Sequence, residues 1–144
     1  MRFFFYGTLL DHDVTALVLG RRLPPRAFLP ATLHGYARHC ARGVTYPVIV
    51  RDPNGTVPGA VVCGLSAIDV ERLAAYEGPR YRIAPLTVEI HGRLTTVSVF
   101  EPLEKRFEPV DGAWDLTLWQ RRYKRAFVDR IRRVLSAHPV YSTR

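Results

Sequence analysis

The sequence contains no apolar run long enough to cross a membrane, which takes roughly 18 or more consecutive apolar residues in a helix. It also shows no pattern typical of a secretory leader. The apolar run that starts at Phe3 is interrupted at Gly7, and two acidic residues, Asp11 and Asp13, follow closely. We therefore expect a cytoplasmic protein with no membrane partner.

Cysteine is scarce, and no metal-binding pattern is present. Cys40 and Cys63 allow one disulfide by count, but for a cytoplasmic chain we expect reduced, buried thiols. The histidines are scattered without the spacing of metal ligands, so we expect no metal site and no cofactor. These histidines are His12, His34, His39, His91 and His138.

Common catalytic and nucleotide-binding motifs are absent as well. The chain has no Gly-x-Ser-x-Gly elbow, no Walker-type loop and no Gly-x-Gly-x-x-Gly. None of these common motifs therefore identifies an active site.

Positive charge is concentrated near the C-terminus. The net charge is +8, and residues 113–144 hold eight Lys and Arg against two Asp, whereas residues 1–112 hold thirteen against eleven. One hypothesis is a basic helix that binds nucleic acid. The alternative, which we prefer, is the solvated face of a docked helix, because the aromatic residues of this segment fall on the opposite, apolar stripe. We therefore do not expect nucleic acid as a partner.

That stripe predicts a long amphipathic helix over residues 113–137, because apolar residues recur every four positions. Its members are Trp119, Tyr123, Phe127, Ile131 and Leu135, with Ala126 and Val134 beside them.

The rest of the chain predicts an α+β fold in one domain, residues 1–144, with a core over 1–112. Short strands are expected at 2–6, 29–38, 45–50, 60–68, 81–90 and 93–102, with a turn over 51–59. Two short helices are expected, one capped by Asp11 or Asp13 and ended by Gly20, the other capped by Ser66 and ended by Gly78. The spacing favours a small mixed β-barrel or strongly curved sheet with flanking helices.

Two local features carry possible chemistry. The first strand ends at Tyr6-Gly7-Thr8-Leu9, where amide N–H groups leave the sheet and can hold a carboxylate or an oxyanion. A plain strand-to-turn junction is the alternative. The second feature is Glu77, at the end of a predicted helix, where the field of the helix end and apolar neighbours would raise its pKa. The alternative for Glu77 is an exposed acid paired with Arg80 or Arg82.

Taken together and in order, these features resemble the gamma-glutamylcyclotransferase-like superfamily, and most closely its avirulence-induced-gene-like and gamma-glutamylamine cyclotransferase branches. The motifs that carry the resemblance are Tyr6-Gly7-Thr8-Leu9, Gly35-Tyr36, Tyr46-Pro47-Val48-Ile49, Gly59 with Gly64, and Glu77-Gly78 followed by Tyr81 and Arg82.

The resemblance implies a cyclotransferase that releases 5-oxoproline and a free amine from a γ-glutamyl compound. It implies Glu77 as general acid/base, and the backbone of Gly7, Thr8 and Leu9 as the group that binds the substrate carboxylate or polarises its carbonyl. Tyr6 and Tyr81 would shape the pocket. Thr8 tilts the expected substrate towards a γ-glutamyl amine or γ-glutamyl amino acid.

Two alternatives stay open beside this enzyme. One is a catalytically silent family member that acts as a small-molecule binding module, and the other is the nucleic-acid binder described above. The sequence does not distinguish a monomer from a homodimer, and it contains no feature that recognises the leaving amine.

Overall fold

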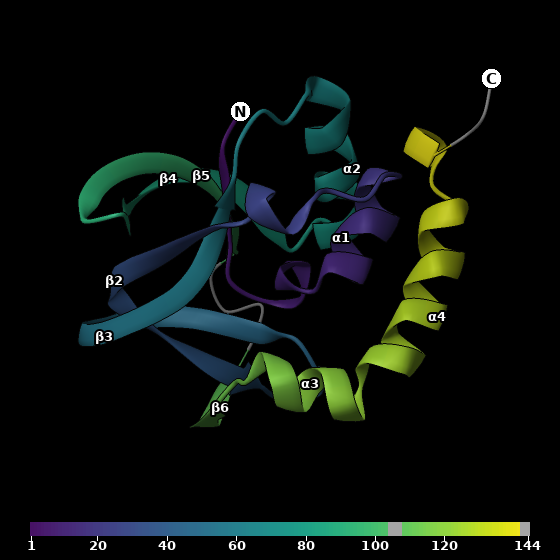
Figure 1. Cartoon of the computed structure of the whole chain (residues 1–144). Helices are drawn as coiled ribbons and strands as arrows, with labels where there is room; N and C mark the ends of the chain where they lie inside the picture. Colours follow the sequence, from purple (N-terminus) through teal and green to yellow (C-terminus); the bar gives the residue numbers. More distant parts are fainter. Residues whose placement is uncertain (104–107, 142–144) are drawn as a thin grey trace.

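The computed structural model describes residues 1–103 and 108–141, and it has an α+β fold. In Figure 1 the strands gather on one side and helices α1, α2 and α4 on the other. The strands are β1 (Phe3–Phe5), β2 (Leu29–Ala41), β3 (Pro47–Val62), β4 (Tyr81–Ile90), β5 (Arg93–Pro102) and β6 (Pro109–Ala113).

The helices follow β1, β3 and β6 along the chain. Short 3₁₀ segments lie at Thr8–Leu10, Pro25–Ala27 and Pro139–Tyr141. Within the described residues, no helix combines the length and the apolarity that crossing a bilayer requires. The α-helices are α1 (His12–Leu19), α2 (Ala67–Glu77), α3 (Leu116–Arg122) and α4 (Lys124–Ser136).

Five strands close into a mixed barrel, which confirms the expected fold class. The order is β3-β1-β5-β4-β2, and β2 pairs with β3 to complete the ring. β1 runs parallel to β5 and antiparallel to β3, while the other pairs of the ring are antiparallel. β6, which the sequence did not predict, pairs with the far end of β2 at His39 and Ala41.

The opening strand β1 separates two cores, because successive side chains of a strand point to opposite faces. Phe3 and Phe5 pack under the helices, in a cluster that includes Leu73. Phe4 and Tyr6 point into the barrel. β1 is therefore a central strand that is covered on both faces.

Helix boundaries also follow the predicted capping residues. The Asp11 carboxylate accepts hydrogen bonds from the amides of Asp13 and Val14 and caps α1. Ser66 caps α2, in a reciprocal capping box with Asp69. Gly78 follows α2 with φ of 82°, a conformation that favours glycine, so the helix ends directly after Glu77.

The turn predicted over 51–59 is wrong as a break between strands, because β3 runs through it. Pairing with β2 jumps from His34↔Thr56 to Tyr36↔Arg51, so the residues between Arg51 and Thr56 form a bulge. The amide of Asn54 donates to the Asp52 carboxylate. This hydrogen bond is typical of a turn, but here it lies within a continuous strand. The strand expected to reach residue 68 ends earlier, at Val62.

The long C-terminal helix is instead two helices, which meet at Tyr123. That residue has φ of −122° and ψ of −21°, and Figure 1 shows α3 and α4 running in different directions. Trp119, Phe127 and Leu135 are buried as the stripe predicted, but Tyr123 is 44% exposed and Val134 is 58% exposed. The change of direction keeps Phe127 and Leu135 on the core and turns those two side chains away from it.

The two cysteines are free thiols, in agreement with the expected reduced state. The expectation that both are buried is wrong, because Cys40 is half-buried and Cys63, which follows the end of β3, is exposed.

Candidate active site

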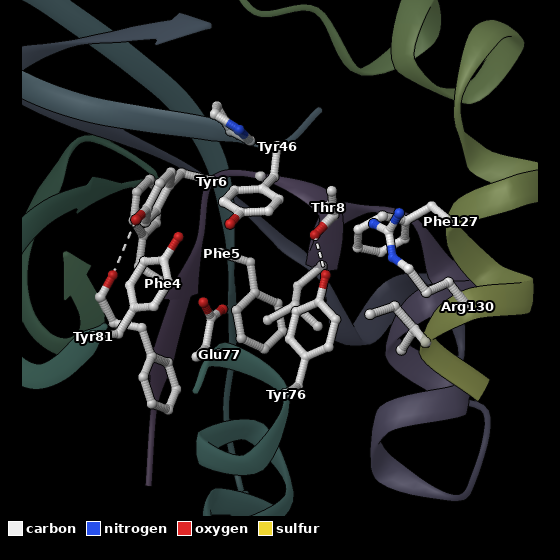
Figure 2. A pocket seen from close by; sticks show the side chains of 15 residues that line it. Phe4, Phe5, Tyr6, Thr8, Tyr46, Tyr76, Glu77, Tyr81, Phe127 and Arg130 are labelled. Atoms are coloured by element: carbon white, nitrogen blue, oxygen red, sulfur yellow. Dashed lines mark hydrogen bonds between the residues drawn. The ribbon is translucent and has the colours of Figure 1, made fainter. Parts of the chain in front are cut away.

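A cavity of about 220 Å³ lies where the barrel meets the helices. Its walls come from the loop after β1, the start of β3, the end of α2 and one face of α4, as Figure 2 shows. This volume is below the roughly 300–1,000 Å³ of pockets for drug-sized ligands, so it suits a group the size of one amino acid.

The loop after β1 forms one wall. A 3₁₀ turn starts at once, with the Leu10 amide donating to the Gly7 carbonyl at 2.9 Å and the Asp11 amide to the Thr8 carbonyl at 3.0 Å. Within the part of the chain that the structure describes, the amides of Thr8 and Leu9 donate no hydrogen bond. Both residues line the cavity, so this wall supplies free backbone donors.

Gly7 is favoured by close packing rather than by its backbone angle, since its φ of −133° is open to any residue. A Cβ at this position would lie 3.0 Å from two ring carbons of Pro47. A larger residue at this position would therefore require the Pro47 ring to move by a few tenths of an ångström.

Arg38 supports this loop from β2. Its Nη1 donates to the carbonyl oxygens of Tyr6 at 2.8 Å and Pro58 at 3.1 Å, and its guanidinium lies 5.2 Å from the centre of the Trp114 ring. Burial lowers its pKa. We did not select Arg38 from the sequence, because an arginine in a strand is ordinarily a solvated surface residue.

The opposite side of the cavity carries Glu77, whose carboxylate points into the hollow from the end of α2 (Figure 2). It makes no hydrogen bond or ion pair with any other described residue, and Arg82 pairs with Glu101 at 2.6 Å instead. The surface pairing of Glu77 with Arg82 is therefore wrong.

The electrostatic state of Glu77 follows from its surroundings. Burial against the cavity walls raises the pKa of Glu77 to about 8. We expected the field of the helix end to contribute, but desolvation is the cause that the structure identifies. With a pKa of about 8, such a carboxyl is mostly protonated near neutral pH, but it lies close enough to its midpoint to exchange a proton readily.

Four tyrosines surround the acid. Burial, reinforced by the nearby Glu77 charge, raises the pKa values of Tyr6, Tyr76 and Tyr81, so these hydroxyls stay protonated. The Tyr6 hydroxyl donates to the Phe100 carbonyl at 3.0 Å, and the Tyr76 and Thr8 hydroxyls bond to each other. Tyr6 therefore shapes the cavity without offering its proton to a ligand.

Tyr46 lies between charges of opposite sign. Burial raises its pKa, Arg80 and Arg130 oppose that rise, and Glu77 adds to it. Tyr46 and Arg130 both line the cavity, with Arg130 projecting from α4. The cavity thus has a carboxylate on one side and a guanidinium on another.

Every residue selected from the sequence as a site residue lines this one cavity: Tyr6, Gly7, Thr8, Leu9, Glu77 and Tyr81. The sequence reasoning missed the lining residues Tyr46, Tyr76, Phe127 and Arg130. Tyr46 was visible as part of the Tyr46-Pro47 motif, and Tyr76 as the neighbour of Glu77. No sequence feature placed Phe127 and Arg130 at the site, because the apolar pattern of a helix does not show which cavity its side chains reach.

Among the described residues, no group of three or more His, Cys, Asp or Glu side chains is placed to hold a metal ion.

The barrel and its flanking helices define a known class of fold. A solved structure named "Gamma-glutamyl cyclotransferase" superposes with a TM-score of 0.57 at 18% identity, covering 76% of this chain and 69% of that one. At this identity the likeness concerns the fold alone.

The family follows from the sequence. A family model described as "Gamma-glutamyl cyclotransferase, AIG2-like" matches residues 3–116, and the chain belongs to this family. Protein AIG2 C of Arabidopsis thaliana is 31% identical over 136 residues, which cover 92% of this chain and 79% of that protein. AIG2-like protein A of the same plant is 28% identical over 134 residues, with the same two coverages. A solution structure of an Arabidopsis thaliana protein superposes with a TM-score of 0.65 at 29% identity, covering 94% of this chain and 81% of that one.

Proposed function

We propose that the protein is a γ-glutamyl cyclotransferase that releases 5-oxoproline and a free amine from a γ-glutamyl amine or γ-glutamyl amino acid. The observation that carries the proposal is the shared cavity of Glu77 and the loop of Gly7, Thr8 and Leu9. An unpaired acid of raised pKa and a set of free amides are the two groups that this reaction requires.

The substrate supplies its own nucleophile. Its α-ammonium gives a proton to the Glu77 carboxylate, and the resulting amine attacks the γ-carbonyl carbon to close a five-membered ring. The carbonyl becomes an oxyanion, which the amides of Thr8 and Leu9 stabilise. The bond from the γ-carbon to the leaving nitrogen then breaks as that nitrogen takes the proton from Glu77. The ring nitrogen passes its surplus proton to the freed Glu77 carboxylate, which hands it to the departing amine, so the products are 5-oxoproline and an ammonium ion. The sequence of steps consumes no other reagent.

The cavity favours ring closure in two further ways. Its small volume keeps the flexible glutamyl chain folded, which removes part of the entropic cost of cyclisation. The ammonium group of a bound substrate also lowers the pKa of Glu77 towards the form that accepts a proton.

The test is a screen for 5-oxoproline, by mass spectrometry, with γ-glutamyl amines and γ-glutamyl amino acids. We expect release by the wild type, and loss of release in Glu77→Gln with the fold retained. If the wild type binds 5-oxoproline or a γ-glutamyl compound but releases no product, the catalytically silent binding module replaces the enzyme. If it does neither, the cavity is not a γ-glutamyl site.

A further inference from the structure

The charged groups of the cavity are distributed unevenly. Among the described residues that line it, Glu77 is the only acidic side chain and Arg130 is the only basic side chain. In Figure 2 the hydrogen-bonded Thr8 and Tyr76 lie between Glu77 and Arg130. The cavity therefore has an acidic end at α2 and a basic end at α4.

The side chain of Arg130 is available to a ligand. It is exposed at the mouth, and its guanidinium lies 5.3 Å from the centre of the Phe127 ring. No carboxylate of the described residues forms an ion pair with it. Stacking on a buried ring holds the group in place while leaving its hydrogen-bond donors free.

The proposed reaction fixes which end of a substrate reaches this cation. The α-ammonium must meet Glu77, and the α-carboxylate of the glutamyl group is attached to the same carbon atom. Both therefore lie at the acidic end, close to the amides of Thr8 and Leu9. The leaving amine, at the far end of the glutamyl chain, extends towards α4.

We propose that Arg130 determines specificity by binding a carboxylate on the leaving group, so that γ-glutamyl amino acids are preferred over γ-glutamyl amines. This inference rests on the proposed function and chooses between its two substrate classes. Arg130 lies in α4, beyond the residues 3–116 that match the family model. Arg130 thus belongs to a different part of the chain from Glu77 and the loop of Gly7, Thr8 and Leu9, which lie within the matched residues.

The experiment compares two probes that differ in one group. γ-Glutamylalanine and γ-glutamylethylamine share the glutamyl group, and the second has hydrogen in place of the leaving-group carboxylate. Each is tested with wild type, with Arg130→Gln, and with Arg133→Gln as the control. Arg133 is an exposed arginine on the same helix that does not line the cavity.

We expect Arg130→Gln to raise KM for γ-glutamylalanine by about tenfold to a hundredfold, the usual effect of losing a charged hydrogen bond. The value of kcat should stay close to wild type, because the contact is equally strong in the ground and transition states. For γ-glutamylethylamine the change should stay within about twofold. Arg133→Gln should leave both probes unchanged.

Other outcomes overturn the inference. An equal loss for the two probes would place Arg130 on the glutamyl group, and no loss for either would mean that it makes no contact. If the wild type releases no 5-oxoproline, the proposed function has failed, and calorimetric Kd values for the same probes and variants decide the inference by the same ratio. If neither probe reacts or binds, both proposals fail.

Discussion

The two sides of the cavity differ in how they are built. The inner wall is defined as the loop after β1 together with Tyr76 and Glu77. It contains the buried Thr8 and Leu9, and the half-buried Arg38 supports it. The outer wall, defined as Phe127 and Arg130 of α4, has a buried ring but an exposed cation. In the proposed reaction, the inner wall would act on the common glutamyl group, whereas the outer wall would face the leaving group.

The largest expected effect in this comparison is that of Glu77→Gln, which removes the proposed proton acceptor of the inner wall. We expect 5-oxoproline release to fall by about 10²–10⁴-fold for every γ-glutamyl substrate, the range of general acid–base catalysis. The matched control is Glu71→Gln, an exposed acid on the same helix, which should behave as wild type. Unchanged turnover in the Glu77 variant would contradict the assigned role.

The next largest effect is expected for Arg38→Gln, which loosens the inner wall without touching substrate. The carbonyl oxygens of Tyr6 and Pro58 lose their donor, so the loop that presents the amides shifts. We expect kcat to fall by up to about a hundredfold for both probes while KM changes little, because misplacement of this size affects the reacting geometry.

The control for that variant is Arg51→Gln, an exposed arginine on the neighbouring strand β3. Thermal unfolding of each variant shows whether the fold is kept. An effect of Arg38→Gln on KM alone would argue that it acts on binding and not through the loop.

A smaller effect concerns the pH dependence of stability. Because the pKa of Glu77 is about 8 in the folded chain and near 4.5 when unfolded, the folded state binds more protons between these values. Stability should therefore fall as pH rises from about 4.5 to about 8. The slope should be weaker in Glu77→Gln, as measured by urea unfolding at several pH values. Parallel curves for wild type and variant would mean that Glu77 titrates normally.

The smallest effect is expected for Tyr6→Phe. The change removes the hydrogen bond to the Phe100 carbonyl and leaves that acceptor without its partner, at a cost of about 1–3 kcal/mol in the free energy of unfolding. Since Tyr6 offers no proton to the cavity, turnover of both probes should stay within about threefold of wild type. A large loss of kcat would show that its hydroxyl takes part in the reaction.

Local signals predicted much of the inner wall. Asp11, Ser66 and Gly78 marked the helix ends, and Gly78 placed Glu77 at the last position of α2. His91 and Gly92, which both have positive φ, form the tight turn that joins β4 to β5. These features depend on a few residues that are neighbours in the sequence, so they can be predicted from the sequence.

Features that depend on contacts between distant parts of the chain were predicted less accurately from the sequence. The turn residues at Asp52 and Asn54 looked like the end of a strand, but pairing with β2 resumes beyond them and extends β3. The apolar stripe of the C-terminal segment gave the buried Phe127 and Leu135, but not the break at Tyr123. Whether a helix continues or bends is settled by the surface on which it packs.

By itself the sequence determined the strand of aromatic residues that divides the two cores, the caps of the helices, and the loop and acid of the inner wall. The tertiary structure alone decided that Glu77 is desolvated rather than paired at the surface, that Arg38 supports the loop, and that Arg130 reaches the mouth of the cavity. The physical reason is that a cap or an alternation is a property of adjacent residues. The pKa of the Glu77 carboxyl and the position of the Arg130 side chain at the cavity depend instead on groups that folding brings together from distant parts of the chain.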